Sequence, residues 1–411
     1  SVSGLWRISQ EPFMANAKWI DNLVVRASYG LQGNIDKNTS PFLLGNYRIE
    51  NILPGGSEDM IDVSGAPNKK LRWEKTHSVN AGFDFAVLNQ AINLSVDYYY
   101  RKGVDLIGTQ MLPLETGFEM LTVNWASMQN QGVEVALSTR NIHTKNFMWT
   151  TNFNFAYNNN KILKEALRED ALEPGREGYP VGALFALKTA GLDEEGYPMF
   201  EGKDGKAVSA MEFFKLQEWG FGATDLTARE RRELYTYVGT ADCPYTGGFN
   251  NTFTYKAFEL GVNFSFDFGG KVRSQPTYSI VDFDKGRNTN RDILNRWTPE
   301  NTETIFPVLL SQNERLDEYM WYSNQNEIYR NLDIWIRDLN YVRLQNIRLG
   351  YTLPANFSRK LGMTSATIAI EGRNLLVFGS SYKNYLDPET MSNAYATPAP
   401  KSVTLSLNLN F

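Results

Sequence analysis

The chain has 411 residues, of which 42% are hydrophobic, 13% aromatic and 21% charged, with a formal net charge of −5. A charge this small and evenly spread argues against a nucleic-acid partner, and no run of about 18 uncharged apolar residues offers a membrane-spanning helix. Cys243 is the single cysteine, so no disulfide is expected within the chain. His77 and His143 lie far from any metal-ligand spacing, so we expect neither a metal site nor an acid–base role for them.

Strictly alternating apolar and polar residues recur along the chain, a pattern that predicts β-strands with one apolar and one polar face. The first two runs are the weakest, and the last residues, "SVTLSLNLNF", alternate without interruption. We therefore expect an all-β protein with eleven strands. In chain order, the expected strands cover residues 1–10, 22–30, 79–87, 92–100, 133–139, 149–157, 249–255, 258–268, 347–353, 366–370 and 403–411.

The two faces of these strands differ in charge. The apolar rows contain no charged residue, whereas the polar rows carry Asp84, Asp97, Glu134, Glu259, Asp267 and Arg348. A soluble antiparallel sandwich produces the same alternation with its apolar face buried. A membrane barrel also produces it, with the apolar face toward lipid and the polar face toward a wet interior.

Row length and aromatic placement favour the membrane barrel. The apolar rows are about nine residues long, close to the length that crosses hydrocarbon at a tilt, whereas sandwich strands average about five or six residues. Aromatic residues stand toward the ends of the rows, where amphipathic rings meet the two membrane interfaces. These aromatic residues are Tyr98, Tyr100, Trp149, Tyr157, Tyr255 and Tyr351.

The connections between the expected strands alternate between short and long. An up-and-down barrel in an outer membrane has tight periplasmic turns and long extracellular loops, whereas a sandwich has no reason for this alternation. We therefore expect a transmembrane antiparallel up-and-down β-barrel over residues 1–411, with its C-terminus at the periplasmic side. Large extracellular loops are expected at about 31–78, 101–132, 158–248, 269–346 and 371–402.

An odd number of strands cannot close a single-chain bacterial barrel, because such barrels have an even count with both termini on one side. The first and last expected strands both run inward, so we expect more strands before residue 1, in another chain or in a removed fragment. Twice eleven is about 22, the size associated with plugged transporters. The chain is expected to supply about the last eleven strands of such a barrel.

Several segments carry a family resemblance. The tail "YVRLQNIRLGYTLP", followed by "IAIEGRNLLVF", "YLDPE" and "PAPKSVTLSLNLNF", resembles the C-terminal signature of the SusC/RagA family of TonB-dependent outer-membrane transporters of Bacteroidetes. Upstream, "WIDNLVVRASYGLQGN", "NQGVEVALSTRNI" and "RWTPENTET" resemble successive blocks of the same family in the same order. The likeness spans nearly the whole chain.

The resemblance implies a 22-stranded barrel in the cell outer membrane that imports large nutrients beneath a SusD-like lipoprotein lid. It implies that the plug and N-terminal half of the barrel lie outside this chain, and that TonB–ExbB–ExbD supplies energy through that part. The terminal aromatic Phe411 is expected to anchor the last strand in the interface and, as in outer-membrane barrels generally, to be read by the assembly machinery.

No Ser/His/Asp set, Gly-rich phosphate loop or metal constellation is recognisable, which favours transport over catalysis and implies no cofactor. Segment 193–205 is acidic and Gly-rich but lacks the calcium-loop pattern, so a solvated hairpin is favoured there. Substrate is expected to meet aromatic residues of the two largest loops, because aromatic faces suit sugar rings; packing within the loops or against the lid is the alternative. The substrate-contact candidates are Trp219, Phe221, Tyr319, Trp321, Tyr322, Tyr329 and Trp335.

The expected function is therefore active import of a large nutrient, with an oligosaccharide favoured and peptides as the close alternative. Two other classes stay open. A passive porin would lack a plug and a TonB box, and a soluble carbohydrate-binding β-protein would extract without detergent.

Overall fold

The computed structural model describes the chain except for residues 38, 54–55, 64, 119, 168, 218–223, 275–285, 287–290, 310–329, 380–386 and 392–395. None of the helices in the described ranges has the length and apolar character to cross a membrane.

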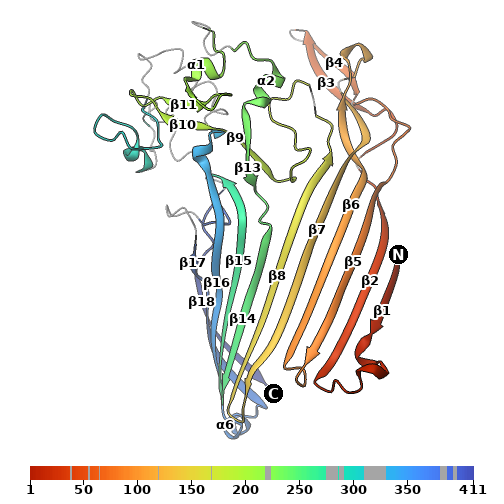
Figure 1. The fold of residues 1–411 in the computed structure, drawn as a ribbon, viewed down its shortest axis with the longest axis vertical. Helices are drawn as coiled ribbons and strands as arrows, with labels where there is room; N and C mark the ends of the chain where they lie inside the picture. Colours follow the sequence, from red (N-terminus) through yellow and green to blue (C-terminus); the bar gives the residue numbers. More distant parts are fainter. Residues whose placement is uncertain are drawn as a thin grey trace. The chain divides into compact units, whose positions relative to one another are not determined.

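One antiparallel sheet of eleven strands dominates the fold (Figure 1). Its hydrogen-bonding order is β1-β2-β5-β6-β7-β8-β14-β15-β16-β17-β18, so each strand follows its predecessor in the chain as in an up-and-down fold. The eleven strands of this sheet each overlap one expected strand, although residues 8–10 of the first expected strand form a 3-10 turn. They are β1 (Val2–Arg7), β2 (Ile20–Asn34), β5 (Glu74–Val87), β6 (Ile92–Met111), β7 (Met120–His143), β8 (Phe147–Lys164), β14 (Tyr245–Tyr255), β15 (Phe258–Arg273), β16 (Ile336–Thr352), β17 (Ser365–Phe378) and β18 (Ser402–Asn410).

Two compact units divide the chain. The first holds residues 1–139, 156–169 and 175–181, and the second holds 140–155, 170–174 and 182–411. Outside the sheet, the first unit carries the hairpin β3 (Gly45–Leu53) and β4 (Gly56–Val63). The second carries the short elements β9 (Ala183–Leu187), β10 (Thr189–Leu192), β11 (Pro198–Glu201), β12 (Ala207–Val208), α1 (Ala210–Phe213), α2 (Ala228–Glu233), β13 (Tyr235–Thr240) and α6 (Ala355–Lys360), and 3-10 turns that include Asp333–Trp335.

The expected loop at 101–132 is mostly strand, which corrects the boundary inferred from the sequence. Strands β6 and β7 stay paired as far as Met111 and Met120, so the connection covers only residues 112–119. A bulge near Asp105, which has φ 58°, shifts the register and interrupts the alternation of apolar and polar residues. Strands β8 and β16 likewise extend into the expected loops 158–248 and 269–346.

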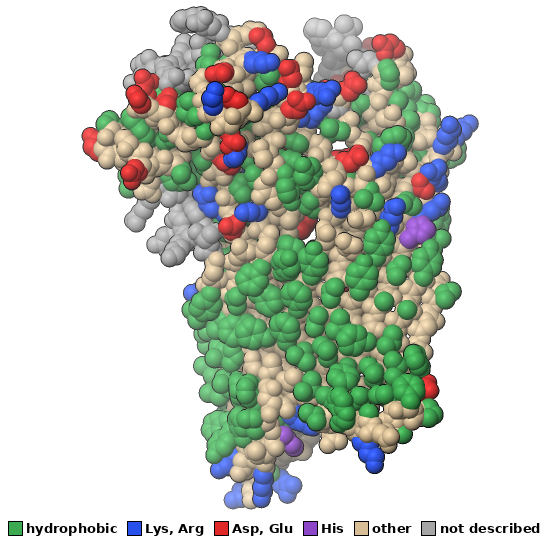
Figure 2. All heavy atoms as spheres, in the orientation of Figure 1, with side chains coloured by type: hydrophobic (Ala, Val, Ile, Leu, Met, Phe, Trp, Pro, Cys, Tyr) green, Lys and Arg blue, Asp and Glu red, His purple; other side chains and the backbone are tan. Residues whose placement is uncertain are grey.

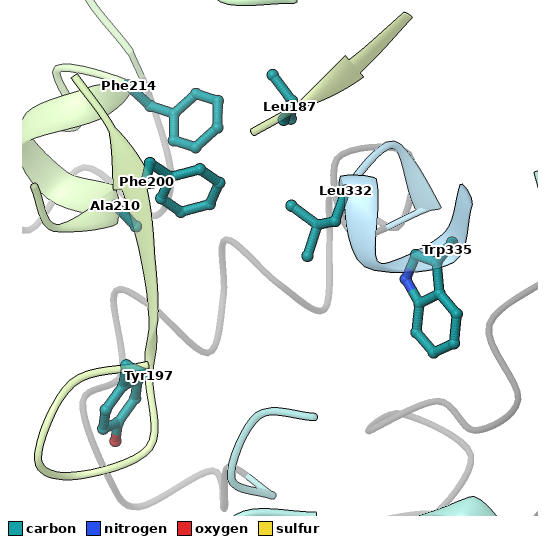
Figure 3. Close-up of a cluster of buried hydrophobic side chains, with 7 residues drawn as sticks. All are labelled: Leu187, Tyr197, Phe200, Ala210, Phe214, Leu332 and Trp335. Carbon is teal, nitrogen blue, oxygen red and sulfur yellow. The ribbon is translucent and has the colours of Figure 1, made fainter. Parts of the chain in front are cut away.

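The main cluster of buried apolar side chains lies in the loop segments of the second unit (Figure 3). Leu187, Phe200 and Phe214 come from the segment 187–214. Leu332 and Trp335 come from the turn before β16. Phe200 stacks on Phe213 with ring centroids 4.8 Å apart. The cluster comprises Leu187, Tyr197, Phe200, Ala210, Phe214, Leu332 and Trp335, and we call it the loop core.

Candidate functional site

The large apolar side chains in the rows of β17 and β18 are exposed rather than buried. On β18, Val403, Leu405 and Leu407 keep 69%, 76% and 59% of their surface exposed, and Ile370, the neighbour of Leu405 on β17, keeps 49%. Figure 2 shows hydrophobic side chains covering the strand region, with charged side chains gathered beyond its ends. A soluble sandwich buries its apolar face, so this exposure argues against that class and fits strands that face lipid.

The opposite face of the first unit carries a polar network centred on Arg26 of β2. Its guanidinium donates to the carboxylates of Asp84 on β5 at 3.0 Å and Asp97 on β6 at 3.2 Å. It also donates to the Ser95 hydroxyl at 3.1 Å, and Ser95 in turn donates to Asp84 at 2.7 Å. Two carboxylates against one cation leave this part of the polar face with an excess negative charge.

The polar face of the second unit is also paired across strands. Arg348 on β16 donates to Glu259 on β15 at 2.9 Å, and Gln345 donates to the Ser265 hydroxyl at 2.7 Å. Asp84, Asp97, Glu259, Asp267 and Arg348, all chosen from the sequence as polar-row residues, thus belong to interstrand hydrogen bonds. A face of amides, hydroxyls and paired charges can line the path of a polar solute.

A buried ion pair ties the last long connection to this polar face. Arg343 on β16 donates to Asp387, and the Nε of Arg343 donates to Glu389 at 2.8 Å. Asp387 also accepts from the backbone N–H groups of Glu389 at 3.0 Å and Ala399 at 3.2 Å. Burial alone would raise the pKa of the Asp387 carboxyl, but these hydrogen bonds and the Arg343 charge hold it below its ordinary value.

Tyr341 extends this arrangement. Its hydroxyl donates to Asp267 on β15 at 2.6 Å and lies 3.3 Å from the Glu389 carboxylate. Sequence reasoning missed Arg343, Asp387 and Tyr341 because the partners are far apart in the chain. The signal that could have found them is the "YLDPE" segment, whose two acidic residues lie in a connection near the end of the chain, together with Arg343 in the preceding alternating segment "YVRLQNIRLGYTLP".

Of the expected substrate-contact residues, Trp219, Phe221, Tyr319, Trp321, Tyr322 and Tyr329 lie outside the described residues. Trp335 is fully buried in the loop core (Figure 3), and its ring lies 5.9 Å from that of Phe306. Trp335 therefore packs within the loops, as in the alternative weighed from the sequence. Phe411 directly follows β18 and keeps 85% of its surface exposed.

Beside the loop core, the second unit has a pocket of about 760 Å³ whose rim is charged with both signs. Lys188 contacts Glu201 at 2.5 Å, Lys206 contacts Asp204 at 3.2 Å and Lys215 contacts Glu230 at 3.2 Å. The pocket also has apolar lining from Val208, Phe213, Leu226 and Leu234. Lysines and carboxylates around one pocket can bind a ligand that itself carries both charges. The sequence did not point to this pocket, because its lining residues come from five short elements and the turns between them.

Glu230 at this pocket also forms the capping box of α2. Its carboxylate accepts from the backbone N–H of Thr227 at 2.9 Å and from the Thr227 hydroxyl at 2.8 Å, while Thr227 caps the Glu230 N–H. These hydrogen bonds, with that from Lys215, lower the pKa of Glu230 to about 2.

Segment 193–205, weighed from the sequence as a calcium loop or hairpin, begins at the turn between β10 and β11. Asp193 accepts from the backbone N–H groups of Glu195 at 3.0 Å and Tyr197 at 2.8 Å. Strands β10 and β11 pair antiparallel on either side, so these contacts close a hairpin. Among the described residues, no group of three or more potential metal-ligating side chains comes together.

Comparisons with known proteins agree with this fold. The profile of the family described as TonB dependent receptor-like, beta-barrel matches residues 13–184. TonB-dependent receptor P3 of Formosa agariphila is 27% identical over 438 residues, which cover 99% of this chain and 41% of the relative. TonB-dependent receptor SusC of Bacteroides thetaiotaomicron is 25% identical over 434 residues, which cover 98% of this chain and 39% of SusC.

Among solved structures, that of the RagAB peptide transporter has a TM-score of 0.76 with this chain at 23% identity. The alignment covers 100% of this chain and 43% of the transporter chain. The chain thus spans about two fifths of the length of the relatives it matches. The resemblance to SusC/RagA TonB-dependent receptors is confirmed, and the fold is that of a partial TonB-dependent receptor β-barrel.

Proposed function

We propose that this chain is the C-terminal part of the barrel of an outer-membrane transporter that imports a large nutrient with energy delivered through TonB. The observation that carries the proposal is the pair of unlike faces. Exposed apolar rows on β17 and β18 suit lipid, and the opposite face carries charge pairs that suit a water-filled interior. The similarity to TonB-dependent receptors, SusC among them, adds support for active import over a passive porin.

The partners follow from the same family. The rest of the barrel and its plug would complete the sheet beside β1 and β18, which are the terminal strands of the sheet order in the described part of the chain. TonB–ExbB–ExbD would act through the plug, and a SusD-like lipoprotein would cover the long loops. In this arrangement the loops face outward and Phe411 lies at the periplasmic side.

An oligosaccharide is the favoured substrate. The polar face is rich in amides and hydroxyls, and its Arg26 network carries more carboxylates than cations, which suits a neutral hydrated solute over a polyanion. The aromatic residues Trp219, Phe221, Tyr319, Trp321, Tyr322 and Tyr329 remain proposed contacts for sugar rings. Because Trp335 is buried, it is proposed to support these loops instead of touching substrate.

A peptide is the second candidate, and one observation favours it. The pocket beside the loop core has lysines and carboxylates on one rim, which matches the two terminal charges of a peptide. RagAB, whose fold this chain shares, is a peptide transporter.

The test is growth of the native bacterium with the complete gene deleted, on an oligosaccharide mixture or a peptide mixture as the sole nutrient. Active oligosaccharide import predicts lost growth on oligosaccharides alone, restored by the complete gene but not by a version without its TonB-binding segment. Loss of growth on peptides alone would establish the second candidate. Equal uptake with and without the TonB-binding segment would establish a passive porin and overturn the proposal.

A further inference from the structure

The outward rows of β5 and β6 both carry basic residues beyond their apolar part, although β6 has only Lys102 before Val104, the partner of Lys75. Val79 on β5 pairs with Tyr100 on β6, and one step further along the same face His77 pairs with Lys102. Lys75 follows His77 on that face of β5. Because side chains two residues apart share a face, Lys75, His77 and Lys102 continue the apolar rows beyond the aromatic border. Figure 2 shows basic side chains beyond the hydrophobic region.

The aromatic border between the apolar rows and the basic residues has the tyrosines that are typical of a membrane–water interface. Tyr29 on β2 keeps 48% of its surface exposed, and its hydroxyl lies 2.8 Å from Nδ1 of His77. Tyr98, which lies two residues before Tyr100 on the same face of β6, is 43% exposed. Tyrosines of this kind rest at the level of lipid headgroups. The basic residues therefore stand where headgroup phosphates would lie.

The three cations Arg72, Lys75 and Lys102 outnumber the one carboxylate, that of Asp105, that pairs with this basic surface. Arg72 and Lys75 share the carboxylate of Asp105, with N–O distances of 2.5 and 3.5 Å. The Glu74 carboxylate is engaged elsewhere, since it accepts from Asn34 at 2.8 Å and from the Ile107 N–H at 2.9 Å. The adjacent outward positions on the flanking strands are Leu31, paired with His77, and Gln129, paired with Lys102.

We propose that Arg72, Lys75, His77 and Lys102 form a binding site for the phosphate headgroup of an anionic membrane lipid. The surface is continuous with the exposed apolar rows that would contact the lipid chains, and its charge opposes that of the headgroup. Lysine and arginine N–H groups donate charge-assisted hydrogen bonds to phosphate oxygens. The inference rests on the membrane placement of the proposed function.

The test uses the complete transporter in detergent micelles and measures its preference for fluorescent phosphatidylglycerol over phosphatidylcholine. The double variant Lys75→Gln/Lys102→Gln should lower that preference about tenfold. Lys75→Arg/Lys102→Arg should keep it. Lys203→Gln/Lys206→Gln, which removes two lysines from the pocket rim of the second unit, is the matched control and should keep it too. Each variant should show the same change of gel mobility on heating as the wild-type protein, which shows that the variant is folded.

Two results would overturn the site. A glutamine double variant that keeps its preference would show that these lysines do not hold the headgroup. Displacement of the lipid by millimolar inorganic phosphate would show a site for a free anion instead. Failure of the complete wild-type protein to insert into vesicles of either lipid would overturn the membrane placement itself, and this outcome is separable from a loss of headgroup preference.

Discussion

Arg343 of β16 and Asp387 of the connection before β18 form an ion pair whose side chains are only 2% and 6% exposed. A pair this deeply buried needs further hydrogen bonds to offset desolvation. Glu389 supplies one to the guanidinium, and the Ala399 N–H supplies one to the carboxylate. The pair therefore fixes the last long connection to the polar face of the sheet.

Replacing Asp387 by Asn should destabilise the complete protein by about 3 kcal/mol, because Arg343 would keep a buried charge with only Glu389 to oppose it. Glu371→Gln is the matched control. It removes a partner of Arg373, whose side chain is 61% exposed, and should cost less than about 1 kcal/mol. Urea unfolding in micelles measures both changes, and equal values for the two variants would contradict the buried-pair account.

The two faces of β18 should differ in their tolerance of charge. Leu405→Arg places a cation on the lipid side and should cost roughly 2–4 kcal/mol near the bilayer midplane, whereas Ser406→Arg meets water and should cost far less. On β15, Phe264→Arg and Asn263→Arg form a second pair with the same expectation. The measurement is the yield of folded complete protein after refolding into lipid. Equal tolerance of all four substitutions would favour a soluble sandwich.

Acid should loosen α2. The pKa of Glu230 is lowered from its ordinary 4.5 to about 2, so the folded state binds the proton more weakly than the unfolded state does. The stabilising contribution is then complete above pH 4.5 and is lost as the pH falls through the range from 4.5 to 2. Hydrogen exchange of the amides of residues 227–234, measured relative to the intrinsic exchange rate at each pH, should accelerate as the pH falls across that range.

Glu230→Gln provides the control for this titration, because a glutamine can keep the capping hydrogen bonds but carries no carboxyl to protonate. Its exchange rates, corrected for intrinsic chemistry, should lack the transition. A transition of the same size in the glutamine variant would assign the acid sensitivity to another group.

Deleting Phe411 from the complete transporter should lower the amount assembled in the outer membrane much more than it weakens barrels already formed. The residue is 85% exposed beyond β18, so few contacts of the described structure depend on it. Quantifying the folded protein in isolated outer membranes, beside its melting temperature, separates recognition during assembly from anchoring. A lower melting temperature with normal assembly would leave only the anchoring role.

The strands could be predicted from the sequence because each side chain of a two-faced sheet meets one of two unlike environments. The expected strand 403–411 and the observed β18, Ser402–Asn410, differ by one residue at each end. The parts of β6 and β7 next to their connection could not be predicted, because beyond the bulge at Asp105 the alternation no longer marks a strand. Alternation of apolar and polar residues reveals a strand only where the two faces of the strand meet different environments.

The site was less predictable for a different reason. Arg343 and Asp387 are joined by the fold across a long stretch of chain, and no local pattern announces a contact of that kind. Trp335 was chosen as an aromatic loop residue, yet composition alone does not tell whether such a ring packs inside a loop or lies on its surface. Pocket residues such as Lys188 and Glu230 come together only through the packing of short elements around the loop core.

The most direct test of the central claim, that one face of this sheet meets lipid and the other meets water, is a cysteine scan of residues 403–408 in the membrane-embedded complete protein after Cys243→Ser. We expect a two-residue alternation. Val403, Leu405 and Leu407 replaced by Cys should carry probes quenched by brominated lipid, and Thr404, Ser406 and Asn408 replaced by Cys should react with a charged maleimide. Quenching and labelling that show no alternation along β18 would contradict it.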